Sequence, residues 1–218
     1  ANARIRRTLR LTERVRHQIR GASVATRTRP DRAPRKAARS GATGLTGVPG
    51  LVLIGTSTGG PAALDVVLPR LPAGFPWPVL VAQHLPASFT GAFARRLDRE
   101  CQLQVVEVDR PMALEAGTIF IGRGDADVTV ASRAAGVIAL PAPAKASYLW
   151  HPSVERMVAS ALENIAASQL IGVLMTGMGN DGAEAMKRLR QGGGRTIAEA
   201  ESTAIVWGMP GELVKNGG

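Results

Sequence analysis

Residues 51–61 read Leu-Val-Leu-Ile-Gly-Thr-Ser-Thr-Gly-Gly-Pro, an apolar run that stops at a loop of small residues. The run Leu51–Ile54 predicts a strand that is buried on both faces. Pro61, directly after two glycines, suits the first turn of a helix that extends toward Leu68. A strand that turns through small residues into a helix is the repeating element of an α/β fold, and this stretch therefore decides the fold class.

The same alternation recurs on the C-terminal side of this stretch. The apolar runs 79–82 and 170–175 predict two more buried strands, and helical periodicity follows each of them. Strands that are apolar on both faces are typical of a parallel sheet covered by helices on both sides. We therefore predict an α/β fold with three layers, αβα, around a doubly wound, mainly parallel sheet.

Three further patterns complete the expected architecture. Phe89, Phe93 and Leu97 recur on one face of the helix after the second strand. Ser153 is a side chain that caps helices, and an apolar stripe follows it at helical spacing. Residues 103–140 contain short apolar segments separated by turn residues, which predicts a meander or a short antiparallel hairpin region.

The positive charge is confined to the N-terminal segment. The net charge is +10, yet residues 1–46 hold 13 of the 27 Lys and Arg and only 2 of the 17 Asp and Glu. Residues 1–48 predict a basic helix followed by a flexible linker, and residues 49–218 a separate folded domain. A nucleic-acid or membrane-surface role for this helix is the alternative, but no aromatic residue interleaves the arginines. We interpret the segment as a solvated connector and expect no nucleic-acid partner.

Cysteine content and hydropathy restrict the remaining classes. Cys101 is the only cysteine, which excludes an intramolecular disulfide and a multi-cysteine metal site and points to a reducing compartment. Cys101 itself is expected to be a small core or surface residue. No apolar run reaches the roughly 18–20 residues that span a bilayer. We expect a cytoplasmic protein without membrane insertion, metal or cofactor, and a chain that is a fragment of a longer polypeptide.

Chemically useful side chains follow three of the predicted strands. Ser57 lies in the loop after the first strand, His84 directly after the second, and Asp181 in a glycine-rich loop after the third. In parallel sheets, functional side chains gather beyond the carboxyl ends of the strands. A nucleophilic serine needs a base to take its proton and an acid to orient that base, and these residues supply the set.

Each of the three residues also has a simpler interpretation. The loop Gly55–Gly60 matches a nucleophile elbow, with backbone N–H groups near Thr58 facing an oxyanion, or it cradles a phosphate without catalysis. The loop lacks the lysine of a phosphate-binding loop. His84 could be a structural histidine, and Asp181 an ordinary cap of the helix 183–190. His151 precedes the Ser153 cap, where it shapes the helix entry or lines the rim of the site.

Five ordered motifs carry a resemblance to a known family. They are GTSTGG at 55–60, QHLPASFTGAFARRL at 83–97, HPSVERM at 151–157, LMTGMGNDGAEAM at 174–186 and TIAEAESTAIVWGMP at 196–210. Together they resemble the catalytic domain of the chemotaxis protein-glutamate methylesterases, the CheB family, over about residues 50–218. The resemblance implies that Ser57, His84 and Asp181 are nucleophile, general base and orienting acid. It implies that Thr58 and Met178 shape the pocket and the oxyanion site.

The resemblance also implies substrates and partners. The family hydrolyses glutamate methyl esters on the cytoplasmic helices of methyl-accepting chemotaxis receptors, and many members deamidate receptor glutamines. Arg95, Arg96 and Arg99 could meet an acidic receptor surface, or form a solvated helix face. We expect this chain to depart from the family in three ways: it has no receiver domain before the linker, it has His151 where Arg is usual, and it ends slightly early. The alternative function is a noncatalytic sugar-phosphate or nucleotide-binding domain that uses the Gly55–Gly60 loop.

Overall fold

The computed structural model describes residues 49–218; the predicted basic helix and linker of residues 1–48 lie outside this range. Its centre is a six-stranded sheet in the order β3-β5-β2-β1-β8-β9, and all neighbouring strands are parallel. The strands of this sheet are β1 (Leu51–Thr56), β2 (Val79–Gln83), β3 (Gln104–Val108), β5 (Thr118–Gly122), β8 (Leu170–Leu174) and β9 (Arg195–Ala198).

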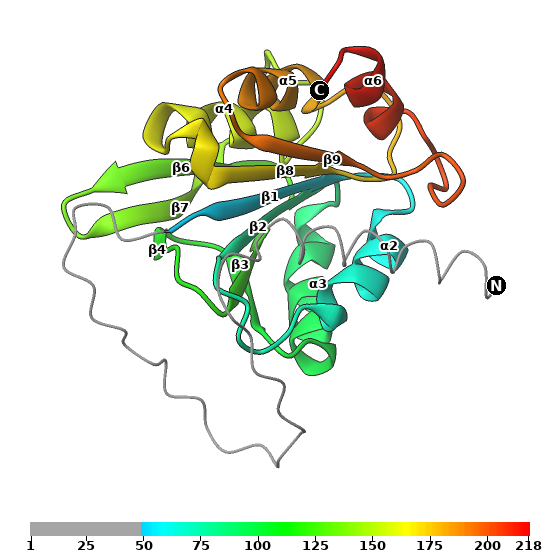
Figure 1. Ribbon diagram of the computed structural model, residues 1–218. Coiled ribbons are helices and arrows are strands. Elements are labelled where there is room, and N and C mark those ends of the chain that lie inside the picture. Colours follow the sequence, from blue (N-terminus) through cyan, green and yellow to red (C-terminus); the bar gives the residue numbers. More distant parts are fainter. Residues whose placement is uncertain (1–48) are drawn as a thin grey trace.

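Helices cover both faces of this sheet, as Figure 1 shows. On one face lie α2 (Gly60–Val67) and α3 (Ala87–Glu100), and on the other α4 (Val154–Asn164), α5 (Ala183–Gln191) and α6 (Met209–Lys215). The short 3-10 helices η1 (Leu68–Arg70) and η2 (Ala167–Gln169) follow α2 and precede β8. The predicted three-layer, doubly wound arrangement is confirmed.

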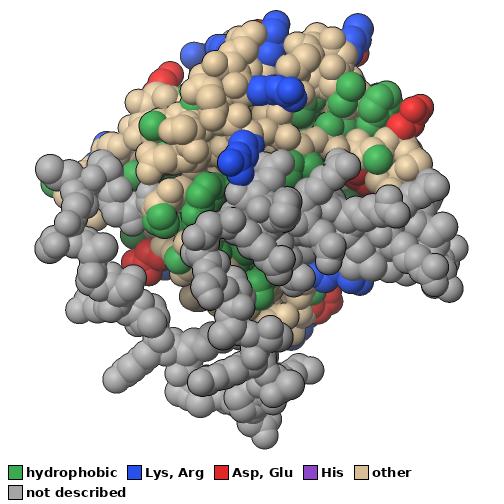
Figure 2. All heavy atoms as spheres, viewed as in Figure 1, with side chains coloured by type: hydrophobic (Ala, Val, Ile, Leu, Met, Phe, Trp, Pro, Cys, Tyr) green, Lys and Arg blue, Asp and Glu red, His purple; other side chains and the backbone are tan. Residues whose placement is uncertain are grey.

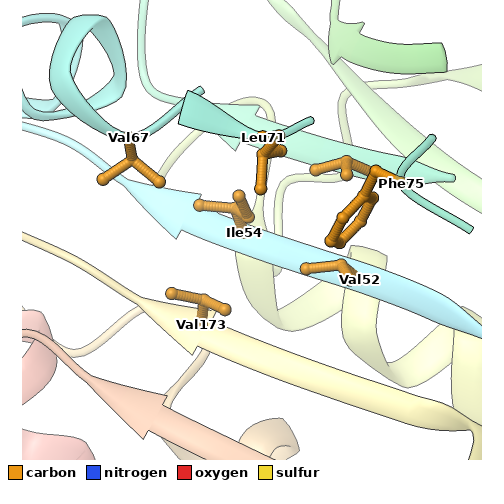
Figure 3. Close-up of a pocket in the computed structure, with 7 residues that line it drawn as sticks. Val52, Ile54, Val67, Leu71, Phe75 and Val173 are labelled. Atoms are coloured by element: carbon orange, nitrogen blue, oxygen red, sulfur yellow. The ribbon is translucent and has the colours of Figure 1, made fainter. Parts of the chain in front are cut away.

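Strand β1 divides the core between the two helical layers. Leu51 and Leu53 point into the cluster formed with α4, α5 and α6, whereas Val52 and Ile54 point into the cluster formed with α2 and α3. This alternation explains the unbroken apolar run, since both faces of the strand are buried. Figure 3 shows a small cavity in the second cluster, between α2, the segment after η1 and the sheet; all seven lining side chains are apolar, so the cavity offers no polar side chain to a ligand.

A second, antiparallel sheet lies at one end of the domain (Figure 1). It contains β4 (Met112–Ala113), β7 (Gly136–Pro143) and β6 (Ala126–Arg133) in that order. The predicted hairpin is therefore right for β6 and β7, which pair antiparallel. It is wrong for β3 and β5, which join the parallel sheet. Ile119, Phe120 and Ile121 of β5 are buried on both faces, as an inner strand of a covered sheet requires.

The helix after β2 shows a second difference from the expected pattern. Phe93 and Leu97 are buried against the sheet, but Phe89, on the same stripe, is 60% exposed. Phe89 belongs to the first turn of α3, directly after the loop that carries His84. The stripe therefore continues beyond the core, toward the carboxyl edge of the sheet.

The strand order places three loops side by side. β1 lies between β2 and β8, so the carboxyl ends of these three strands are neighbours. From β1 the chain adds β2, then β3 at the edge and β5 between β3 and β2, and later returns to add β8 and β9 on the other side of β1. The order therefore reverses at β1, and such a reversal opens a crevice at the carboxyl edge where ligands bind in open α/β sheets.

Candidate active site

Register brings Ser57 and His84 together. Thr56, the last residue of β1, pairs with Gln83, the last residue of β2. Ser57 and His84 are the next residues of their strands, so they leave the same edge of the sheet side by side. Asp181 comes from the loop between β8 and α5, on the other side of β1.

The three side chains form one hydrogen-bonded chain. Ser57 Oγ lies 3.0 Å from His84 Nδ1, and His84 Nε2 lies 2.9 Å from Asp181 Oδ2. The His84 and Asp181 side chains are 9% and 6% exposed. A neutral imidazole that donates from Nε2 to the carboxylate leaves Nδ1 free to accept the serine proton. The geometry therefore suits proton transfer from serine to histidine.

Besides His84, three other donors bond to the Asp181 carboxylate. Ser153 Oγ donates to Oδ1 at 3.1 Å, and the backbone N–H groups of Val154 and Glu155 donate at 2.7 Å to Oδ2 and 3.0 Å to Oδ1. These two N–H groups open α4, so Asp181 occupies the N-terminus of α4. The alternative that Asp181 caps the helix 183–190 is wrong: Gly182 is the N-cap of that helix, and no side chain bonds it there.

The loop that carries Ser57 is fixed from several directions. Ser57 N–H donates to Thr176 O at 2.9 Å, and Ser57 O accepts from Gly60 N–H at 2.8 Å. Gln83 Nε2 donates to Ser57 O and to His84 O, at 3.1 Å each. Gly59 has a φ of 82°, a left-handed conformation that a glycine adopts without strain. These bonds fix the backbones of Ser57 and His84 relative to each other.

Thr58 and Met178, the residues that the resemblance assigns to the oxyanion site, directly follow Ser57 and Gly177 in the chain. Within residues 49–218, no hydrogen bond uses the backbone N–H of Thr58 or Met178. Gly177, directly before Met178, lies against Ser57, because a Cβ on Gly177 would fall 2.8 Å from Ser57 Cβ. The Met178 side chain is 61% exposed. These two N–H groups are therefore candidates to receive a developing oxyanion.

Trp150 is a site residue that the sequence reasoning missed. Its ring stacks on the His84 imidazole, with 5.7 Å between the centroids and 13° between the planes. Trp150 directly precedes the motif at 151–157, but nothing in its local pattern predicts a contact with a residue 66 positions earlier. His151 does not reach the triad; its Nδ1 lies 2.9 Å from Asp127 Oδ1, at the entry to α4.

A buried glutamate bonds to the backbone segment that also holds the serine loop. Glu199 Oε2 accepts the backbone N–H of Thr176 at 2.8 Å, and Glu199 is 4% exposed. Burial raises the pKa of Glu199 above its usual range, although the bonds from Thr176 and Thr203 act in the opposite direction. Thr176 O in turn accepts from Ser57 N–H. Glu199 is therefore linked to the serine loop through the backbone of Thr176.

Charge on the described domain is mixed. Where Figure 2 shows described residues, Lys and Arg side chains are scattered, with acidic side chains between them. Arg96 lies 2.9 Å from Asp65, and this bond raises the pKa of Arg96.

Among residues 49–218, no three His, Cys, Asp or Glu side chains cluster as metal ligands would, and no helix is long and apolar enough to cross a membrane. Cys101 is buried, which raises the pKa of its thiol to about 12.

Comparison with known proteins gives one consistent result. A family model described as CheB methylesterase matches residues 52–218. The chain is similar to protein-glutamate methylesterase/protein-glutamine glutaminase 2 of Rhodopseudomonas palustris, with 67% identity over 218 residues, 100% of this chain and 59% of that protein. A protein of the same activity name from Rhodospirillum rubrum is 54% identical over 220 residues, 100% of this chain and 57% of that protein.

A solved structure extends the likeness to the fold. The catalytic domain of the Thermotoga maritima CheB methylesterase matches with a TM-score of 0.73 and 35% identity, over 77% of this chain and 88% of that chain. The expected resemblance and the expected fold are thereby confirmed. The chain spans less than two thirds of the length of the two relatives above, at 59% and 57%.

Proposed function

The chain belongs to the CheB methylesterase family, and on that premise we propose that it is a serine hydrolase that removes methyl esters from glutamate side chains of chemotaxis receptors. Residues 49–218 would form the catalytic domain and residues 1–48 its connector. The resemblance also implies a receiver domain in the full-length protein. The observation that carries the proposal is the hydrogen-bonded chain Ser57–His84–Asp181 at the carboxyl edge of the sheet.

The geometry supports acyl transfer. Ser57 Oγ attacks the glutamyl ester carbonyl while His84 Nδ1 takes its proton, and the N–H groups of Thr58 and Met178 stabilise the oxyanion. His84 returns the proton to the leaving methoxide, and methanol departs. Water then attacks the acyl-enzyme, again with His84 as base. Asp181 holds the imidazole in the required tautomer and stabilises its positive charge.

The same steps suit receptor glutamines, with ammonia as the leaving group in place of methanol. We therefore propose glutaminase activity as a second reaction of this site. The two relatives above carry both activities in their names. The alternative function, a noncatalytic sugar-phosphate or nucleotide-binding domain, finds no support in these comparisons.

Exposed apolar side chains around the triad favour a macromolecular substrate. Six large apolar residues are exposed in residues 49–218, and five of them lie on the segments around the triad. These five, named the apolar rim here, are Phe89, Leu149, Trp150, Met178 and Ile205. Such a rim suits the apolar stripe of an amphipathic helix. We propose that the partners are cytoplasmic helices of methyl-accepting receptors, and that the protein acts in the cytoplasm.

Methanol release from a methylated receptor fragment tests the proposal. The described domain should release methanol, and a fragment with glutamine at the same sites should release ammonia. Ser57→Ala should abolish both, whereas Ser168→Ala, an exposed serine in η2 before β8, should change neither. Absence of both products with a correctly folded protein would overturn the proposed function.

A further inference from the structure

Asp127 is a buried carboxylate outside the triad. Its side chain lies on β6, is 0% exposed, and accepts three hydrogen bonds. Nδ1 of His151 lies 2.9 Å from Oδ1, the backbone N–H of Ser153 donates to Oδ1 at 2.8 Å, and Nη1 of Arg156 donates to Oδ2 at 2.6 Å. Burial disfavours the charged form, but these bonds outweigh it and hold the pKa of Asp127 below its usual range.

All three donors belong to one segment. Residues 151–156 form the entry and the first turn of α4, and Ser153 is its N-cap. Nη1 of Arg156 also donates to Pro143 O on β7, at 2.7 Å. The small antiparallel sheet therefore fastens the N-terminus of α4 at two points, and Asp127 is the more buried of the two.

The same segment supplies the surroundings of the triad. Ser153 Oγ and the N–H groups of Val154 and Glu155 are the donors that hold Asp181, and Trp150, one residue earlier than His151, stacks on His84. A shift of this segment would move the Asp181 donors and the stacked indole together. Displacements of about 1 Å in a catalytic array can cost about 10²-fold in rate.

We propose that Asp127 is a positioning residue of the active site: from the antiparallel sheet it fixes the segment 150–156, which in turn fixes Asp181 and His84. Asp127 touches no reacting atom. The inference rests on the proposed function, which supplies its substrate. The main property that it predicts is the reactivity of Ser57. Loss of Asp127 should lower kcat and should slow the labelling of Ser57 by a small reagent, which does not need the apolar rim for binding.

Asp127→Asn tests this role, with Asp98→Asn as its matched control. Asp98 is a half-buried carboxylate on α3 that accepts the backbone N–H of Val105 at 2.9 Å, away from the triad. In Asp127→Asn, the amide nitrogen must face at least one of the three donors and the negative charge opposite Arg156 is lost, so the segment is held less firmly. We expect both kcat for methyl-ester hydrolysis and the rate of Ser57 labelling by a fluorophosphonate to fall about 10- to 100-fold. In Asp98→Asn both rates should stay within about two-fold of wild type.

Two further results separate the possible failures. If Asp127→Asn has a lowered melting temperature but keeps wild-type kcat and labelling, Asp127 is only structural and the inference is wrong. If Asp127→Asn does not fold, His151→Leu and His151→Gln take its place: the leucine should slow labelling and the glutamine, which keeps an N–H donor, should restore it. Equal labelling of these two would overturn the inference. A wild-type protein that is labelled but releases no methanol would contradict the proposed function alone.

Discussion

Oδ2 of Asp181 accepts the backbone N–H of Val154 at 2.7 Å and faces His84 Nε2 at 2.9 Å, so one carboxylate oxygen joins the N-terminus of α4 to the imidazole. The positive end of the helix dipole and the imidazole thus share an anion. Asp181, which we propose as the orienting acid, is therefore also a tertiary anchor. Substitutions of Asp181 should affect stability as well as turnover.

Asp181→Asn should lower turnover by about 10³- to 10⁴-fold, because the imidazole loses the acceptor that fixes its tautomer. It should also destabilise the domain by about 1–3 kcal/mol, since an amide nitrogen must face at least one buried donor. The measurements are ester hydrolysis and urea unfolding. Asp125→Asn is the control: Asp125 accepts the N–H of Ala87 at the start of α3 and should keep full turnover. Wild-type turnover in Asp181→Asn would remove Asp181 from the mechanism.

Ser57 and His84 should behave as one unit. Both act in the same proton transfer, so Ser57→Ala or His84→Ala alone should remove most of the activity. The double variant should be little worse than either single variant. Rates on a methylated receptor fragment measure this. Losses that multiply in the double variant would show that the two side chains act in separate steps.

Glu199 should make stability depend on pH. Its raised pKa means that the folded protein binds the proton more tightly than the unfolded chain does. The free energy of unfolding should therefore fall as pH rises from the ordinary glutamate pKa through the raised one. Glu199→Gln stays neutral and keeps an oxygen for the N–H of Thr176, so it should be less sensitive to pH in that window.

Urea unfolding across this pH range tests the effect, with Glu199→Ala as the control. The alanine leaves the Thr176 N–H without its acceptor and should be about 1–3 kcal/mol less stable than Glu199→Gln at every pH. The stability difference between Glu199→Gln and wild type should grow as pH rises. Parallel curves for these two proteins would show that Glu199 does not titrate in the folded state as inferred.

The apolar rim should matter for receptor fragments and not for small esters. Phe89→Ser and Ile205→Ser should each lose about 1 kcal/mol of contact with a receptor helix, which is about five-fold in KM. Hydrolysis of a small soluble methyl ester should be unchanged. Val214→Ser is the control and should alter neither; Val214 is the remaining exposed large apolar residue of the described domain. Equal effects on the two substrates would mean that the rim shapes the site itself.

Local patterns predicted much of the fold. The apolar run of β1, the Ser153 cap of α4 and the helix α5 are all present, because burial on both faces and capping leave a local signature. The assignment of β3 and β5 to the parallel sheet was not predicted. Strand order depends on pairing between distant segments, and short apolar runs with turns between them suit a hairpin equally well.

The candidate site was predicted only in part. Ser57, His84 and Asp181 follow buried strands, so the rule that function gathers at strand ends pointed to them. Trp150 and Asp127 lie at no such position. Asp127 sits in the alternating run of β6, where a buried and a solvated aspartate look alike in sequence. Its burial follows from a partner segment 24–29 residues later in the chain.

The most direct test of the central claim is the mass of a methylated receptor fragment after incubation with the described domain. Wild type should remove one methylene mass at each esterified glutamate. Ser57→Ala, folded to the same melting temperature, should remove none. Loss of the methyl groups at the same rate with Ser57→Ala would contradict the assignment of this site as a serine methylesterase.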